Sequence, residues 1–270
     1  MKKWITIFCV LCIAFTTCTS NPLTGKSTMA FVGNNDLFPA SFQAYDEIIK
    51  ESKIITGTPE AEMVARVGNR IRIAAEKWLA SEGNSHYLDG YEWEFNLIDS
   101  NEVNAWCMPG GKIAFYTGIL PITKNEDGLA VVMGHEVSHA LLNHGQQRMS
   151  AGVLQELGAV GLTLGMGLAG LSSTSQEVAM LAYGLGTEVG GTLPFSRKHE
   201  SESDRYGLIL MAIAGYNPDE AAPFWERMSA LGGGGVPQFL STHPSDTTRI
   251  KQIKEWVPEA RQMAEKLRKN

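Results

Sequence analysis

An H-E-x-x-H segment at positions 135–139 constrains the fold of this chain of 270 residues more than any other feature. It lies in an apolar stretch running from about position 126 to position 144, which predicts a buried helix. His135 and His139 are four residues apart and therefore share a helix face, so both imidazoles can reach one metal ion. Glu136 lies about 100° further round the helix and can act as a general base without binding the metal. We predict one zinc ion per chain.

A zinc site of this kind needs a third protein ligand. A metzincin would carry it ten residues after the first histidine, but that position is Gly145, so this class is excluded. His144 is turned away from the ligand face and is interpreted as a helix-end histidine. A second segment offers Glu200 and Asp204, which also share a helix face. If Glu200 binds the metal, Asp204 can accept the free N–H of a ligand histidine. The alternative, a solvated acidic helix start, stays open.

Four segments together resemble metallopeptidase family 48 of the gluzincin clan, which includes HtpX, the CAAX prenyl proteases, mitochondrial Oma-type proteases and periplasmic BepA-like lipoproteins. They are Asn104-Ala105 with Pro109-Gly110-Gly111, the H-E-x-x-H helix, Glu200 with Asp204, and Thr242-His243-Pro244 with Arg249. The resemblance covers most of residues 41–257 and implies that Glu200 is the third zinc ligand. Because the chain lacks the helical repeats and the several spans of some members, it resembles the stand-alone periplasmic lipoprotein branch.

The expected fold is α+β and mainly helical, a gluzincin-type zinc peptidase domain with a small β-sheet beside the active-site helix. Alternating residues predict a strand at 93–97, and two further runs separated by Pro109-Gly110-Gly111 predict a hairpin. We predict that the second run, with Asn104 and Ala105, is an open edge that binds an unfolded substrate as an added strand.

Peptide-bond hydrolysis follows from these parts, with Glu136 taking a proton from the attacking water and passing it to the leaving amine. His243 is the first candidate for stabilising the oxyanion, and Arg249 is a weaker one that we also place in the surroundings of the ligands. Two alternatives for His243 stay open, because a neutral imidazole is also a good zinc ligand. It is either an inhibitory fourth ligand or a plain loop histidine.

The N-terminus has the layout of a secretory signal, with Lys2 and Lys3, an apolar run from position 5 to position 15, and small residues up to Cys18. We therefore predict a signal peptide at 1–17, a lipid-anchored tether at 18–40 beginning with an acylated Cys18, and the zinc peptidase domain at 41–270. Ordinary cleavage or a retained anchor are the alternatives. The expected location is the bacterial cell envelope, as a periplasm-facing lipoprotein of the outer membrane.

The expected function is a zinc endopeptidase that degrades misfolded or misassembled envelope proteins. A formal charge of −6 makes nucleic acid an unexpected partner. A zinc-bearing chaperone or scaffold with incidental protease activity is the alternative, against which the intact Glu136 argues. The apolar stretch 152–171 supports a third hypothesis, a membrane-embedded protease. We prefer to interpret this stretch as part of a helical hairpin over the active site.

Overall fold

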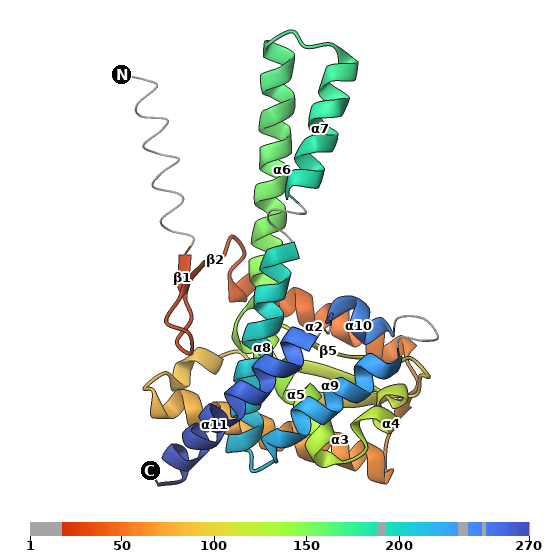
Figure 1. Ribbon diagram of the computed structural model, residues 1–270, viewed down its shortest axis with the longest axis vertical. Coiled ribbons are helices and arrows are strands. Elements are labelled where there is room, and N and C mark those ends of the chain that lie inside the picture. The colour runs from red at the N-terminus through yellow and green to blue at the C-terminus, as the bar shows by residue number, and fades with distance from the viewer. Residues whose placement is uncertain (1–17, 188–192, 232–236, 245–246, 270) are drawn as a thin grey trace.

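The computed structural model describes residues 18–187, 193–231, 237–244 and 247–269, so the predicted signal peptide at 1–17 lies outside the described residues. The predicted class is confirmed, since the described chain is mainly helical with two small sheets (Figure 1). The elements are β1 Cys18–Ser20, β2 Ser27–Met29, α2 Asn34–Glu51, β3 Ile54–Ile55, α3 Pro59–Ser81, η1 Ser85–Leu88, β4 Glu94–Ile98, β5 Ala105–Met108, β6 Lys112–Tyr116, η2 Thr117–Ile119, α4 Leu120–Thr123, α5 Glu126–Leu141, α6 His144–Leu168, α7 Ser173–Thr187, α8 Leu193–Ile213, η4 Pro218–Glu220, α9 Ala221–Ala230, α10 Gln238–Thr242 and α11 Thr247–Lys269.

Residues 18–40, predicted as a tether, hold regular structure. β1 and β2 form an antiparallel pair, and α2 begins at Asn34, within the predicted tether. The turn between the strands is fixed by Asn21, which is buried and donates through its amide to the carbonyl of Leu141 and to the hydroxyl of Tyr87. A buried amide with two long-range partners holds this segment against the domain. Its proposed role as a membrane tether remains a prediction.

The larger sheet has the strand order β3-β4-β6-β5. The hairpin predicted around Pro109-Gly110-Gly111 is present, because β5 pairs antiparallel with β6. The strand predicted at 93–97 is β4 and pairs parallel with β6. β5 is therefore an edge strand, and its position beside α5 agrees with the predicted small sheet next to the motif helix.

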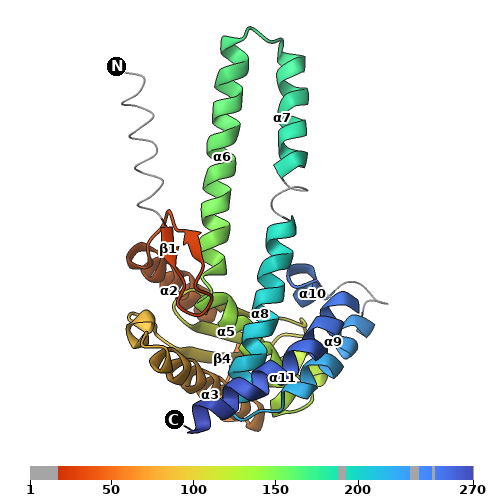
Figure 2. The ribbon, with the colours of Figure 1, turned by 60° about the vertical axis from the view of Figure 1, so that its left-hand side comes forward.

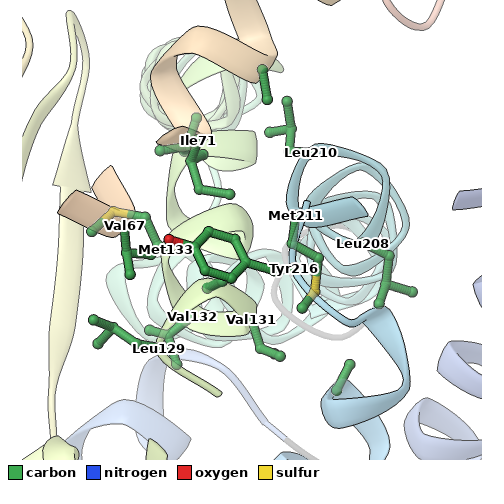
Figure 3. Packing of buried hydrophobic residues seen from close by; sticks show 14 of the residues in the cluster. Val67, Ile71, Leu129, Val131, Val132, Met133, Leu208, Leu210, Met211 and Tyr216 are labelled. Atoms are coloured by element: carbon green, nitrogen blue, oxygen red, sulfur yellow. The ribbon is translucent and has the colours of Figure 1, made fainter. Parts of the chain in front are cut away.

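The motif helix α5 lies at the centre of the domain, and every residue from Gly128 to Leu141 is buried. A helix that is apolar on all sides needs neighbours on all sides. α3 and α8 supply most of them, and Figure 3 shows the ring of Tyr216 between Met133 of α5 and Met211 of α8. The N-cap of α5 is Asn125, whose side chain accepts from the N–H of Gly128. The hydroxyl of Thr123, just before this helix, donates to the carbonyl of Leu120.

α5 and α8 approach so closely that their backbones touch. A Cβ atom added at Gly134 would lie 2.7 Å from the carbonyl oxygen of Gly207, and one added at Gly207 would lie 2.8 Å from the backbone nitrogen of His135. Only glycine fits both positions at this separation. Gly207 shares a helix face with Glu200 and Asp204, so the contact brings these carboxylates toward the histidines of α5.

α6 and α7 form the predicted helical hairpin, but the hairpin does not cover the active site. Both views show it projecting away from the domain as a stalk (Figures 1 and 2). Only the first turns of α6, with buried His144, Gln146 and Ser150, pack against the domain. The prediction was wrong because a Gly- and Ala-rich apolar sequence specifies helices without specifying what they pack against.

The close contact of α5 and α8 predicts that Gly207→Ala destabilises the protein by about 1–3 kcal/mol, since the added methyl group must push the helices apart. Gly161→Ala in α6 is the matched control, because an added Cβ there meets nothing within 4 Å and should stabilise the helix slightly. Urea denaturation followed by circular dichroism measures both. Equal stability of the two variants would contradict the close approach.

Candidate active site

Four side chains from α5, α8 and the end of α10 converge on one point. His135, His139, Glu200 and His243 are all buried, and one ligand atom of each lies within 4.8 Å of the others. Nε2 of His135 lies 3.0 Å from Nε2 of His139 and 3.3 Å from Oε2 of Glu200. Nδ1 of His243 lies 3.1 Å from Nε2 of His135 and 2.9 Å from Oε2 of Glu200.

These donors fit a zinc ion. A tetrahedral zinc with ligand distances of about 2.0–2.1 Å separates its donors by roughly 3.3 Å, close to the spacing of this cluster. Nitrogen donors with one carboxylate oxygen are the set that zinc takes in proteins. The cluster also favours positive charge, because Glu200 and Asp204 raise the pKa of His135 to about 9 although burial opposes the rise. The cofactor of this site is zinc.

Glu136 is buried beside the cluster but is not part of it. Its Oε1 has no hydrogen-bond partner among the described residues and lies 3.4 Å from Nε2 of His243. Burial raises the pKa of Glu136 above its usual value, against the opposing effect of His243 and His135. A buried carboxylate oxygen without a partner is costly, which is typical of a group kept for chemistry.

His135 is held from behind by a buried carboxylate. Oδ1 of Asp204 lies 2.9 Å from Nδ1 of His135, which leaves Nε2 to face the cluster. Arg249 donates to both oxygens of Asp204, at 2.6 and 2.7 Å, and its guanidinium lies 3.4 Å from the ring centroid of Trp225. Although burial opposes it, Arg249 lowers the pKa of Asp204. Arg249 therefore positions Asp204 and lies behind the ligands.

His139 has a similar support that the sequence interpretation missed. Nδ1 of His144 lies 3.0 Å from Nδ1 of His139, and Nε2 of His144 lies 3.4 Å from Oε2 of Glu202. The other oxygen of Glu202 accepts from Lys26 at 2.6 Å. If Nε2 of His139 binds zinc, its Nδ1 carries the proton and donates to His144. This chain of contacts fixes the tautomer and orientation of His139.

A helix break explains why His144 was assigned to the wrong face. α5 was predicted to run to His144, but it ends at Leu141, and Asn143 adopts a left-handed conformation with φ of 56°. The break turns α6 and returns His144 to its neighbour His139. Asparagine is among the few residues that adopt this conformation readily, so Asn143 was the available signal.

The segment around α10 reaches both the cluster and the edge of the sheet. Besides the contacts of His243, the N–H of Phe239 donates to the carbonyl of Val103, just before β5. The ring of Phe239 lies 4.7 Å from that of His243 between centroids. This short segment therefore contacts both the donor cluster, through His243, and the start of the edge strand, through Phe239.

The predicted substrate-binding residues lie at the start of β5. The N–H of Tyr116 donates to the carbonyl of Asn104, and the side chain of Asn104 accepts from the N–H of Ala105. In an antiparallel pair alternate residues face the partner strand, so the N–H groups of Ala105 and Cys107 point away from β6. A small cavity lined by Cys107, Pro109 and His139 lies next to this edge.

The fold and this site define a zinc metallopeptidase. Residues 69–257 match the sequence profile of "Peptidase family M48", and the chain belongs to this family. The resemblance to Oma-type and BepA-like members is thereby confirmed.

Named relatives agree with the family assignment. The chain is 36% identical over 223 residues to mitochondrial metalloendopeptidase OMA1 of Schizosaccharomyces pombe, covering 80% of this chain and 60% of the relative. It is 27% identical over 263 residues to human mitochondrial metalloendopeptidase OMA1, covering 93% and 48%. It is 30% identical over 182 residues to the β-barrel assembly-enhancing protease of Escherichia coli, covering 63% and 36%. The chain thus spans 60% or less of the length of these three relatives.

The predicted location in the bacterial outer membrane, as a periplasm-facing lipoprotein, is wrong. Matches to fungal, plant and animal proteins that extend over much of this chain are to mitochondrial metalloendopeptidases. The prediction had followed from the secretory layout of the N-terminus and from the missing spans and repeats, and such features do not specify a compartment. Acylation of Cys18, the first residue of β1, stays a prediction.

Replacement of a ligand separates metal binding from catalysis. We expect Glu200→Ala to lose zinc and Glu136→Gln to retain about one zinc per chain, because Glu200 belongs to the donor cluster and Glu136 does not. Inductively coupled plasma mass spectrometry of purified protein measures the zinc content. Full zinc occupancy in Glu200→Ala would overturn its assignment as a ligand.

The support of His139 by His144 predicts that His144→Ala weakens zinc binding by about 10–100-fold. His144→Gln should recover part of this loss, because its carbonyl oxygen can accept the same hydrogen bond. His86→Ala, at an exposed position in η1, is the control. Competition with a fluorescent zinc chelator measures the affinities, and equal affinity in His144→Ala and His86→Ala would exclude the positioning role.

Proposed function

We propose that the protein is an endopeptidase that cleaves unfolded or misassembled proteins. The observation that carries this proposal is the buried carboxylate of Glu136 beside a zinc-compatible cluster, next to an edge strand. A pure binding protein has no use for a general base at this position. Relatives named metalloendopeptidases support the endopeptidase activity.

The residues of the site have separate roles in this reaction. Bound zinc supplies Lewis acidity, which polarises a carbonyl group and makes water more acidic. Glu136 takes the proton from the attacking water and delivers it to the leaving amine. Asp204 and His144 keep Nε2 of His135 and of His139 directed at the metal.

The edge strand β5 provides main-chain binding for a substrate. An extended chain that pairs with the outward N–H of Cys107, and with that of Ala105 in place of the Asn104 side chain, would lie beside His139, along the cavity lined by Cys107 and Pro109. Pairing of this kind uses the backbone and has little sequence preference. It therefore suits unfolded substrates of varied sequence.

His243 has the geometry of a resting fourth ligand. Its Nδ1 lies 3.1 Å from Nε2 of His135 and 2.9 Å from Glu200, within the donor cluster. A group that stabilises an oxyanion is instead expected about 3 Å from the substrate oxygen. The distances support the inhibitory alternative for His243, with α10 covering the site until a substrate moves it.

Cleavage of a reduced, unfolded protein tests the function. The wild type should cleave it and Glu136→Gln should not. Cys107→Pro should slow cleavage roughly tenfold by removing one main-chain hydrogen bond, with zinc content unchanged. Cys107→Ala keeps the N–H and is the control. Full activity of Glu136→Gln would refute the proposed chemistry, and full activity of Cys107→Pro would refute only the docking of substrate on β5.

The resting role of His243 predicts that His243→Ala raises the basal rate of cleavage, because a coordination position becomes available for water. The oxyanion role predicts the opposite, a loss of about two to three orders of magnitude. Steady-state kinetics on the unfolded protein, with His86→Ala as control, decide between them. A rate equal to wild type would exclude both roles.

A further inference from the structure

The hairpin of α6 and α7 exposes most of the large apolar side chains on the described surface. Ten of the twelve exposed large hydrophobic residues lie between positions 149 and 181. In α6 they include Leu157, Leu164 and Leu168, which are 62%, 63% and 91% exposed. These residues recur at helical spacing and form a stripe along the stalk seen in Figures 1 and 2.

The hairpin lacks the charged face that an amphipathic helix in water normally has. From position 149 to position 187 the charged residues are Glu156 and Glu177 alone. α6 contacts α7 through Thr163, whose hydroxyl lies 3.6 Å from the sulfur of Met180, and Met166 near the end of α6 is 5% exposed. Along most of their length the two helices present apolar side chains outward, which is unusual for a hairpin surrounded by water.

The length and the ends of the hairpin match a lipid bilayer. Residues 151–168 of α6 rise about 27 Å, close to the hydrocarbon thickness of about 30 Å. The tip beyond α6 is polar, with a run of hydroxyl and amide side chains at 172–176. At the base, exposed cations lie where the hairpin leaves the domain, in position to meet anionic headgroups. They are Arg148 in α6 and Arg197 and Lys198 in α8.

The first described strand, β1, starts on the same side of the domain. β1 lies beside the base of α6, and its N-terminal end points in the direction of the hairpin in both views (Figures 1 and 2). The apolar run at 5–15 precedes this end of β1 in the sequence. An acyl chain on Cys18, the first residue of β1, would attach at this end of the strand.

We propose that the α6–α7 hairpin inserts into a lipid bilayer, with the polar tip and the basic base at its two water boundaries. α6 begins at His144, which contacts the ligand His139, so insertion holds the metal site at the membrane surface. Substrates are then met where unfolded segments emerge from the bilayer. The proposal concerns where the site stands and does not depend on which bonds it cleaves.

Photocrosslinking of the full chain to vesicles tests the insertion. The vesicles contain phosphatidylcholine, phosphatidylglycerol and a phospholipid with a diazirine on its acyl chain, and mass spectrometry maps the labelled residues. Labelling is expected on α6 beyond Glu156 and on α7. The double variant Leu164→Glu/Leu168→Glu should lose this labelling. Ile73→Glu, at a 40% exposed position of α3, should keep it.

Several outcomes would overturn the proposal. One is labelling confined to the N-terminal segment, and another is unchanged labelling of α6 in the double variant. A third is crosslinking between hairpins of two copies in lipid-free buffer together with no lipid labelling, which would identify a second copy as the occupant. Unchanged zinc content and circular dichroism of the soluble fraction confirm that the variants fold. Because no readout uses cleavage, failure of the proposed peptidase activity would leave this result unaffected.

Discussion

The contact between Gly134 and Gly207 sets the geometry on which the rest of the site depends. Because the backbones of α5 and α8 are in contact there, the side chains of His135, His139 and Glu200 are long enough to meet at one point between the two helices. A larger residue at either position would increase the spacing of the helices by more than the tolerance of a zinc site. α5 is buried on every side and also packs against α3 and α9, which hold it in place against α8.

The buried cluster carries a cost that links stability to metal. Glu200 and Asp204 are buried carboxylates, and burial alone would raise the pKa of each, yet their partners lower both. Asp204 has a permanent partner in Arg249, whose guanidinium stacks on Trp225. Glu200 has only imidazoles and Arg249 Nη2 at 3.4 Å near it among the described residues, so a cation in the cluster removes much of its penalty. Folding and zinc binding are therefore coupled through Glu200.

The sequence carried the central part of this site because helical periodicity alone aligns His135 with His139 and Glu200 with Asp204. It also indicated the sheet hairpin, since Pro109-Gly110-Gly111 separates two strand-like runs. It failed where local signals compete. The helix was predicted to continue past Leu141 because an apolar run does not show where one residue adopts a left-handed conformation. The contact of His144 with His139 was missed as a result.

Another failure concerns the position of the helical hairpin. The hairpin was assigned to the active site because apolar helices need a partner, and the sequence does not say whether that partner is protein or lipid. The tether role of residues 18–40 remains a prediction, but the sequence did not show that Asn21 bonds to Tyr87 and Leu141, more than sixty residues away. The composition of a segment does not show which hydrogen bonds it makes with residues far away in the sequence, and such bonds can decide its structure.

The position of α10 connects substrate binding to the state of the metal site. Val103 is two residues before Ala105, so its carbonyl also points away from β6. This carbonyl accepts a hydrogen bond from the N–H of Phe239. An extended substrate that pairs along β5 competes for this carbonyl and displaces Phe239. The N–H of His243 donates to the carbonyl of Phe239 at 2.8 Å, so the two residues move together. Under the proposed function, arrival of a substrate strand withdraws Nδ1 of His243 from the ligands, and the peptidase opens only when a chain is in place to be cut.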